Sequence, residues 1–469
     1  TNPAGAVTMA STLAVTGNVD FNGDLDVDGT TNLDVVDVDG AVNFAADVTL
    51  ANGADLITAS AGTSNFRAGV NAGNSIESGG NYNVVVGDEA GTAITTGDDN
   101  VLVGYSAGDA ITTGTRNVAV GTGAAGTNVS GDYNVAVGYE SLTTSTASQN
   151  TALGFRSLRS DTTGADNVAI GRSALQENTS ASNNVAVGHL SLKNNTTGTQ
   201  NVAVGALALD ANTTASYNTA VGYNALTANT TGADNTAVGR TALENNTTAD
   251  NNTAVGKAAL AQNTTGASNT ALGSLALNLN TTGISNTAVG KSALGANTTA
   301  NANTAVGYNS LTANTTGTEN TAVGTEALNA TITGSYNTAV GRSALLLTTG
   351  DHNTAVGRIA LRTNSSGANN TALGSRSMYS NSSGGNNTAV GVNALDANTT
   401  ASNNTAIGYR AGTTTTTGAD NVAVGSDALF ANTTGASNVA IGHDALGENT
   451  TASNNTAVGM SALVANTTG

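Results

Sequence analysis

Few side chains in this sequence could perform chemistry, and they are widely spaced. The 469 residues include three histidines, His189, His352 and His443, and no cysteine. His189 and His443 occupy the same place in an internal repeat, but the repeats that hold them are too far apart to share a metal ion. Asp351 beside His352 supplies two members of a Ser-His-Asp arrangement, yet no nucleophile elbow accompanies them. We therefore expect no catalytic site and no enzymatic activity.

One acidic segment near the start matches the opening of a calcium-binding loop. Asp24, Asp26 and Asp28 precede Gly29, but the twelfth position of such a loop is Val35 and not Glu. The Leu and Val between the aspartates are typical of a strand whose Asp side chains point into solvent. We expect a solvated strand face here. Weak calcium binding between stacked aspartates is the alternative, and no other cofactor is indicated.

A set of large side chains is the best candidate for ligand binding. In the repeat described below, the residue after an invariant Gly is often aromatic or basic, and nine of the chain's 14 bases lie in this place or the next. Stacked repeats would align these side chains as a rib suited to glycans or anionic polymers. A solvated corner that only maintains solubility is the alternative. The candidate rib comprises Tyr105, Tyr139, Arg172, Tyr223, Arg240, Lys257, Lys291, Tyr308, Arg342, Arg358 and Tyr409. The same place also holds Phe155, His189 and His443, and the next place holds Arg156, Arg376 and Arg410.

The elements that would position these side chains are units of a strict repeat. Asn, then Thr or Val, then a residue that is usually Ala, an aliphatic residue and Gly recur in 23 copies between Asn83 and Asn455. Twenty of the 22 intervals are 17 residues, and two are 16, from Asn134 to Asn150 and from Asn337 to Asn353. A fixed period of this kind predicts a solenoid, with one coil per repeat.

Each part of the unit has a predicted structural role. In residues 218–234, Thr219 and Val221 should face one way and Ala220 the other, as in a short strand. The segment ending in Ala225-Leu226 can form a second strand, and Gly222 marks the corner between the two. The Asn-Thr-Thr-Gly sequence from residue 229 is turn chemistry that closes the coil. Stacked coils would align the repeated Asn residues in a ladder of side-chain amides.

A thin interior is expected for each coil. The core of one coil would contain one Val or Ile, one Leu and a few Ala or Val, which bury little area against the entropy of ordering 17 residues. We therefore expect several chains to share a core, as a parallel homotrimer. A monomeric solenoid with two or three sides is the alternative.

The first 82 residues have a different pattern. Residues 1–53 alternate apolar and polar side chains, with glycines at intervals of six (Gly17, Gly23 and Gly29), which predicts a shorter β-repeat. Residues 54–82 are rich in Gly, Ala, Ser and Asn and are expected to be a junction. The 23-repeat solenoid is expected to occupy residues 83–469.

Composition excludes several classes of function. The net charge of −18 argues against nucleic acid as a partner, and residues 1–82 hold ten acids against Arg67 alone. No apolar run is long enough to span a membrane, so we expect no membrane insertion by this chain. Disulfides and thiolate chemistry are excluded because cysteine is absent, which suits a location outside the cell. No secretion signal is recognisable at the start.

The repeated motif resembles the head repeat of trimeric autotransporter adhesins. The resemblance is carried by sequences such as Asn117-Val118-Ala119-Val120-Gly121 and covers residues 83–469. It implies a left-handed parallel β-roll in a homotrimer that holds a binding surface away from a cell. The longer unit, with its Asn-Thr-Thr-Gly turn, also resembles phage tail-fibre proteins that end in an endosialidase-type chaperone.

These observations support three hypotheses about function. The first is a non-enzymatic extracellular fibre or adhesin shaft on a cell or virion surface, whose partners are copies of itself and a host glycan or protein. The second is a self-assembling filament subunit, because neither end has an obvious polar cap. The third is ice binding through Thr ladders, which is weaker because Thr alternates with Val and much of the Thr lies in turns.

Overall fold

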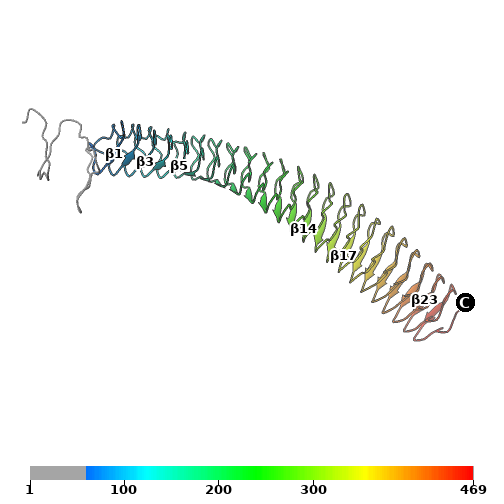
Figure 1. Cartoon of the computed structure of the whole chain (residues 1–469). Helices are drawn as coiled ribbons and strands as arrows, with labels where there is room; N and C mark the ends of the chain where they lie inside the picture. Colours follow the sequence, from blue (N-terminus) through cyan, green and yellow to red (C-terminus); the bar gives the residue numbers. More distant parts are fainter. Residues whose placement is uncertain (1–59, 468–469) are drawn as a thin grey trace, which may run out of the picture. The chain divides into compact units, whose positions relative to one another are not determined.

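The computed structural model describes residues 60–467 as a parallel β-solenoid, and these residues include no helix. Each coil contributes one strand of three residues, and the coils follow one another in chain order (Figure 1). The strands are β1 (Phe66–Ala68), β2 (Val84–Val86), β3 (Val101–Val103), β4 (Val118–Val120), β5 (Val135–Val137), β6 (Thr151–Leu153), β7 (Val168–Ile170), β8 (Val185–Val187), β9 (Val202–Val204), β10 (Thr219–Val221), β11 (Thr236–Val238), β12 (Thr253–Val255), β13 (Thr270–Leu272), β14 (Thr287–Val289), β15 (Thr304–Val306), β16 (Thr321–Val323), β17 (Thr338–Val340), β18 (Thr354–Val356), β19 (Thr371–Leu373), β20 (Thr388–Val390), β21 (Thr405–Ile407), β22 (Val422–Val424), β23 (Val439–Ile441) and β24 (Thr456–Val458).

The strands form a single parallel sheet in which each strand pairs with the next one along the chain. Equivalent residues of successive repeats are aligned, including across the two 16-residue intervals. β1 lies in the segment expected to be a junction and pairs with β2, so the described part of the stack includes one coil before the first predicted repeat. The predicted β-repeat of residues 1–53, with Asp24, Asp26 and Asp28, lies outside the described residues.

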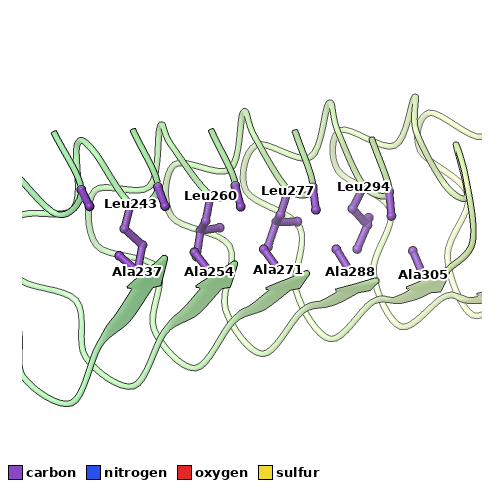
Figure 2. Packing of buried hydrophobic residues seen from close by; sticks show 14 of the residues in the cluster. Ala237, Leu243, Ala254, Leu260, Ala271, Leu277, Ala288, Leu294 and Ala305 are labelled. Atoms are coloured by element: carbon purple, nitrogen blue, oxygen red, sulfur yellow. The ribbon is translucent and has the colours of Figure 1, made fainter. Parts of the chain in front are cut away.

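Small and branched side chains fill the interior of each coil. The central Ala of the strand and the Leu of the opposite limb are buried and face each other, as Ala237 and Leu243 do (Figure 2). The prediction that the strand's Val belongs to the core was wrong, because Val238 and its equivalents lie on the outer face and are only partly buried. Ala at the centre of the strand leaves room for the Leu from the opposite limb, so the thin coil closes within one chain.

The invariant Gly forms the predicted corner, and no residue with a Cβ fits in its place. Gly222 has a φ of +137°, and a Cβ placed on it would lie 2.6 Å from the carbonyl oxygen of Gly239 in the next coil. Residues with a Cβ rarely adopt this φ. The Gly239 carbonyl cannot move away easily, because hydrogen bonds hold the backbone of its coil in place. Strict recurrence of this Gly therefore follows from how closely successive corners stack.

The limb after the corner is not the second strand that the sequence predicted. Residues at two places in it have left-handed φ values, as in Asn224 (54°) and Leu226 (54°). Their amides point to opposite neighbours: Asn224 donates to the Ala206 carbonyl of the previous coil, and Leu226 donates to the Ala242 carbonyl of the next. The limb therefore keeps bonds between coils while its backbone turns, which an extended strand could not do.

The repeated Asn forms an unbroken ladder of buried hydrogen bonds from Asn65 to Asn455. Along this ladder, each Asn backbone amide donates to the side-chain oxygen of the Asn one coil earlier, at N–O distances of 2.8–3.1 Å. Asn218 shows the second half of the arrangement, because its Nδ2 donates to the Gly232 carbonyl at the end of its own coil, at 2.9 Å. The predicted ladder is confirmed.

A shorter ladder is formed by the Asn of the closing turn. Asn229 donates from Nδ2 to the side-chain oxygen of Asn212 in the previous coil, at 3.1 Å, and to the Gly232 carbonyl, at 2.9 Å. This second ladder is interrupted where the turn holds another residue, such as Thr331 or Thr348. The turn role predicted for Asn-Thr-Thr-Gly is therefore accompanied by a role in the interior.

The corner geometry predicts that Gly222→Ala lowers the free energy of unfolding by about 1–3 kcal/mol from backbone strain alone. Urea unfolding followed by circular dichroism would measure the change. Gly126→Ala is the control, since a Cβ on Gly126 would come no closer than 3.4 Å to another atom. Equal stability of the two variants would contradict the account of the corner.

Candidate functional site

The structure places all eleven candidate rib residues in one exposed column, directly after the corner glycines. The column brings Tyr223, Arg240 and Lys257 together on three successive coils. Residues with small side chains interrupt it elsewhere, among them Ala206 and Ser274. The predicted rib is thus a set of local groups, and the groups have to be considered one at a time.

Contacts within these groups are between aromatic rings and cations. The rings of Tyr139 and Phe155 stack with their centroids 5.4 Å apart, and the Arg172 guanidinium lies 6.0 Å from the Phe155 ring. Lys291 Nζ lies 6.0 Å from the Tyr308 ring centroid. Interactions of this type at exposed sites are worth about 0.5–1 kcal/mol each.

The histidines are dispersed as the sequence predicted. His352 stacks on Tyr336 of the previous coil, with ring centroids 4.8 Å apart. The neighbouring Asp351 accepts a hydrogen bond from the Ser335 backbone amide. Within residues 60–467, no group of three or more His, Asp or Glu side chains is placed to hold a metal ion.

The two 16-residue coils differ from the others in a shared way. Each lacks one residue of the closing turn, and a hydroxyl residue replaces the turn Asn: Ser145 in the first and Thr348 in the second. The coil that follows each of them carries two arginines, whereas no other repeat between residues 83 and 469 carries more than one cation. We call the two regions the first and second short-coil sites.

At the first short-coil site both arginines pair with one carboxylate of the same chain. Glu140 Oε2 lies 2.9 Å from Arg156 Nε and 3.0 Å from Arg159 Nε. The pKa of Glu140 is lowered, most strongly by a hydrogen bond from Tyr139 and further by the two guanidinium groups. These contacts favour the charged form of Glu140, in which the carboxylate pairs with both guanidinium groups.

At the second short-coil site the corresponding arginines are Arg358 and Arg362. Where the first site has Glu140, this site has Ser343, and Arg342 replaces Tyr139. No carboxylate of residues 60–467 lies within ion-pair distance of these three arginines. The second site therefore has three unpaired cations close together.

A cavity of about 280 Å³ lies among these side chains. Its lining comprises Glu326, Arg342, Ser343, Arg358, Ile359, Arg362 and Tyr379. Arg362 Nη1 donates to the Tyr379 hydroxyl at 2.9 Å. The Arg376 guanidinium lies 4.7 Å from the Tyr379 ring centroid and is paired with Asp396 at 3.0 Å. Tyr379 therefore holds Arg362 in place at the cavity wall.

Sequence reasoning found part of this site and missed the rest. Arg342 and Arg358 were predicted as rib residues, but Arg362, Tyr379, Glu326 and Ser343 were not. Arg362 and Tyr379 are each the tenth residue of their repeat, four places after the column of Arg342 and Arg358. The two columns line one cavity only in the folded coil. The available signal was the doubling of arginines after each 16-residue interval.

A buried carboxyl group lies beside the first short coil. Asp161 is in the place of the turn Asn, is fully buried, and accepts hydrogen bonds from Ser145 Oγ and Asn178 Nδ2, both at 2.7 Å. Burial raises the pKa of Asp161 to about 6, against the lowering effect of these hydrogen bonds. No cation of residues 60–467 forms an ion pair with Asp161, so the charged form is disfavoured inside the stack.

The architecture and its repeat define the class: this chain is a long parallel β-solenoid repeat protein. No family model matches the sequence, and no curated protein matches it either. The described part of the chain contains no helix that is long and apolar enough to cross a membrane. The class is therefore established by the fold alone.

The Asp161 environment predicts a pH-dependent local stability. Because the folded pKa is raised, the stabilising contribution of the protonated form is complete below the unfolded pKa of 3.8 and is lost as pH rises through about 6. A shift of this size corresponds to roughly 3 kcal/mol. We expect Asp161→Asn to slow amide hydrogen exchange in residues 145–165 by about tenfold or more at about pH 7.5, and to have little effect near pH 4.

Asp166→Asn is the matched control for this experiment. Asp166 lies in the same coil but is exposed, so its replacement removes an equal charge without changing the interior. Equal exchange in the Asp161→Asn variant and the unmodified protein at the higher pH would contradict the burial argument.

Proposed function

We propose that this protein is the shaft of a non-enzymatic extracellular fibre or adhesin, located on a cell or virion surface and assembled from copies of itself as a homotrimer. The observation that carries the proposal is the outer face of the sheet. This face presents two uncharged columns over the full length of the repeat array. The resemblance to trimeric adhesin heads and to phage tail fibres, noted from the sequence, supports the same assignment.

The outer face is built from the second and fourth residues of each repeat. The second column contains Val or Thr and the fourth contains Val, Leu or Ile, while the Ala between them is buried. Several fourth-column residues are more than one-third exposed, such as Leu272 at 48% and Ile407 at 41%. The exposed face is therefore regular and uncharged, and its fourth column is apolar.

The absence of charge on this face is notable in such an acidic chain. The sequence has 32 acids and 14 bases, yet none of them occupies either column in the 23 repeats. With 24 strands about 4.8 Å apart and columns about 7 Å apart, the face covers on the order of 800 Å². In a homotrimer this face would be shared between two neighbouring chains, with about 400 Å² for each, which is about half of what a standard interface buries on each partner.

The proposed trimer rests on this face and not on a shared core. A single chain already buries its Ala and Leu side chains and its Asn ladder, so packing between chains would add to an interior that is closed. The dispersed histidines support a structural role over a catalytic one. Absence of cysteine suits a location outside the cell.

Light scattering of the purified protein would test the assembly. We expect a mass three times the 45.6 kDa of one chain. Val255→Lys combined with Val289→Lys places charges in the middle of the outer face and should shift the mass toward a single chain, because buried unpaired ammonium groups are costly. Thr265→Lys combined with Thr299→Lys adds the same charges to the exposed turns of the same coils and should leave the mass unchanged.

Three other results would favour different functions. A mass of one chain at every concentration would overturn the proposed assembly. Long polymers seen in negative stain would favour the filament subunit. Thermal hysteresis would favour ice binding, for which the outward Thr column from Thr219 to Thr405, unbroken over β10 to β21, is the relevant feature.

A further inference from the structure

We propose that the second short-coil site binds one acidic sugar unit, a saccharide that carries a carboxylate or a sulfate group. This ligand class rests on the proposed function, because an adhesin needs a ligand to bind. It does not depend on how the chains assemble, because every residue that lines the cavity belongs to four successive coils of one chain, and Asp396, which pairs with Arg376, belongs to the fifth.

The positive charge of this site is concentrated, and none of its three arginines is in an ion pair within the described residues. Arg342 and Arg358 follow the stacked corners of neighbouring coils, where a Cβ on Gly341 would lie 2.6 Å from the Gly357 carbonyl oxygen and 3.2 Å from the Arg358 amide. Their backbones are therefore in contact. Together with Arg362 they place three guanidinium groups around one cavity that a single carboxylate, Glu326, also lines. An anion in the cavity would relieve their mutual repulsion.

At the first short-coil site, the chain itself supplies the carboxylate that pairs with the arginines. Arg156 and Arg159 there share Glu140, which occupies the place of Ser343. The backbone conformations match, since φ is 48° at Glu140 and 52° at Ser343. Two similar coils thus differ in whether the chain supplies the carboxylate, and the second site leaves that place for an external group.

The remaining lining favours a sugar over a simple inorganic anion. Tyr379 and Ile359 supply apolar surface for the C–H face of a ring. Glu326 is an acceptor for hydroxyl groups and itself accepts a hydrogen bond from Ser343 Oγ at 3.2 Å. The cavity volume of about 280 Å³ is close to the lower limit for small-molecule sites, which suits a single monosaccharide unit. Arginine forks bind carboxylate and sulfate oxygens in pairs, and the acceptor beside them selects a ligand that also carries hydroxyls.

The geometry of the arginines is partly fixed before any ligand binds. Arg362 is held by the Tyr379 hydroxyl, and the Tyr379 ring also contacts Arg376, which pairs with Asp396. Preorganisation of this kind reduces the entropy lost on binding. Arg342 and Arg358 are exposed and reach the ligand from solvent.

The test measures binding of four probes to the full chain by saturation-transfer NMR and isothermal titration, at physiological ionic strength. The probes are a glucuronate-containing oligosaccharide, a sulfated oligosaccharide, a neutral oligosaccharide of the same length, and inorganic sulfate. We expect at least one acidic oligosaccharide to bind at least about tenfold more tightly than both the neutral one and sulfate.

Two variants locate the binding. Ser343→Glu rebuilds the internal carboxylate of the first site without removing any arginine, and it should weaken the acidic sugar about tenfold or more. Arg358→Gln should have a similar effect. Ser292→Glu is the control, because it adds the same charge at the equivalent place of a regular coil, with φ of 57°, and should leave binding unchanged.

Several results would overturn the inference. These are the failure of both acidic oligosaccharides to bind, equal affinity for inorganic sulfate, or equal weakening by Ser292→Glu and Ser343→Glu. The outcome is separable from the proposed assembly, because light scattering of Ser343→Glu reports the oligomeric state independently. If Ser343→Glu keeps the oligomeric mass of the unmodified protein and no longer binds the acidic oligosaccharide, the ligand binds at this site.

Discussion

The structure depends on one side chain per coil, the Asn that opens each repeat. In most coils it joins the start of its coil to the end through Nδ2, and it joins its coil to the next through Oδ1, as Asn218 does with Gly232 and Asn235. Asn252 is an exception, because its Nδ2 has no hydrogen-bond partner. Both bonds are buried, where an unmade hydrogen bond costs about 1–3 kcal/mol. Because half of these bonds run to the next coil, a single coil cannot satisfy its own interior. The strict period follows, since a change in length at this place would leave buried polar groups without partners.

This dependence explains where the repeat tolerates change. The two 16-residue coils lose their residue in the closing turn, and the ladder from Asn65 to Asn455 continues through both of them. The exposed place after the corner Gly holds different residues in different coils, among them Tyr, Arg, Lys, His, Ala and Ser. Such variation is tolerated because the corner backbone does not depend on that side chain. Function can therefore change along this column while the fold stays constant, and the second short-coil site lies at such a place.

Much of the fold could be predicted from the sequence because its signals are repeated. The Asn ladder, the corner Gly and the order of the coils follow from period and residue type. The second limb could not be predicted in the same way: Leu226 and its equivalents adopt left-handed φ values imposed by neighbouring coils, against the preference of the residue itself. The outward position of Val238 was missed because alternation gives two faces without saying which is inside. The cavity was missed because Arg358 and Arg362 meet Tyr379 only across coils.

The central claim is that cohesion passes between neighbouring coils through the Asn ladder, and amide hydrogen exchange of an Asn286→Ala variant tests it most directly. Asn286 makes three hydrogen bonds to Asn269 and Ala300 and accepts one from Asn303. We predict exchange at least about tenfold faster in residues 269–319, with distant coils unaffected. Asn278→Ala, in the adjacent coil but only partly buried, should change little. Unchanged exchange around Asn286, or equal acceleration along the whole array, would contradict the account.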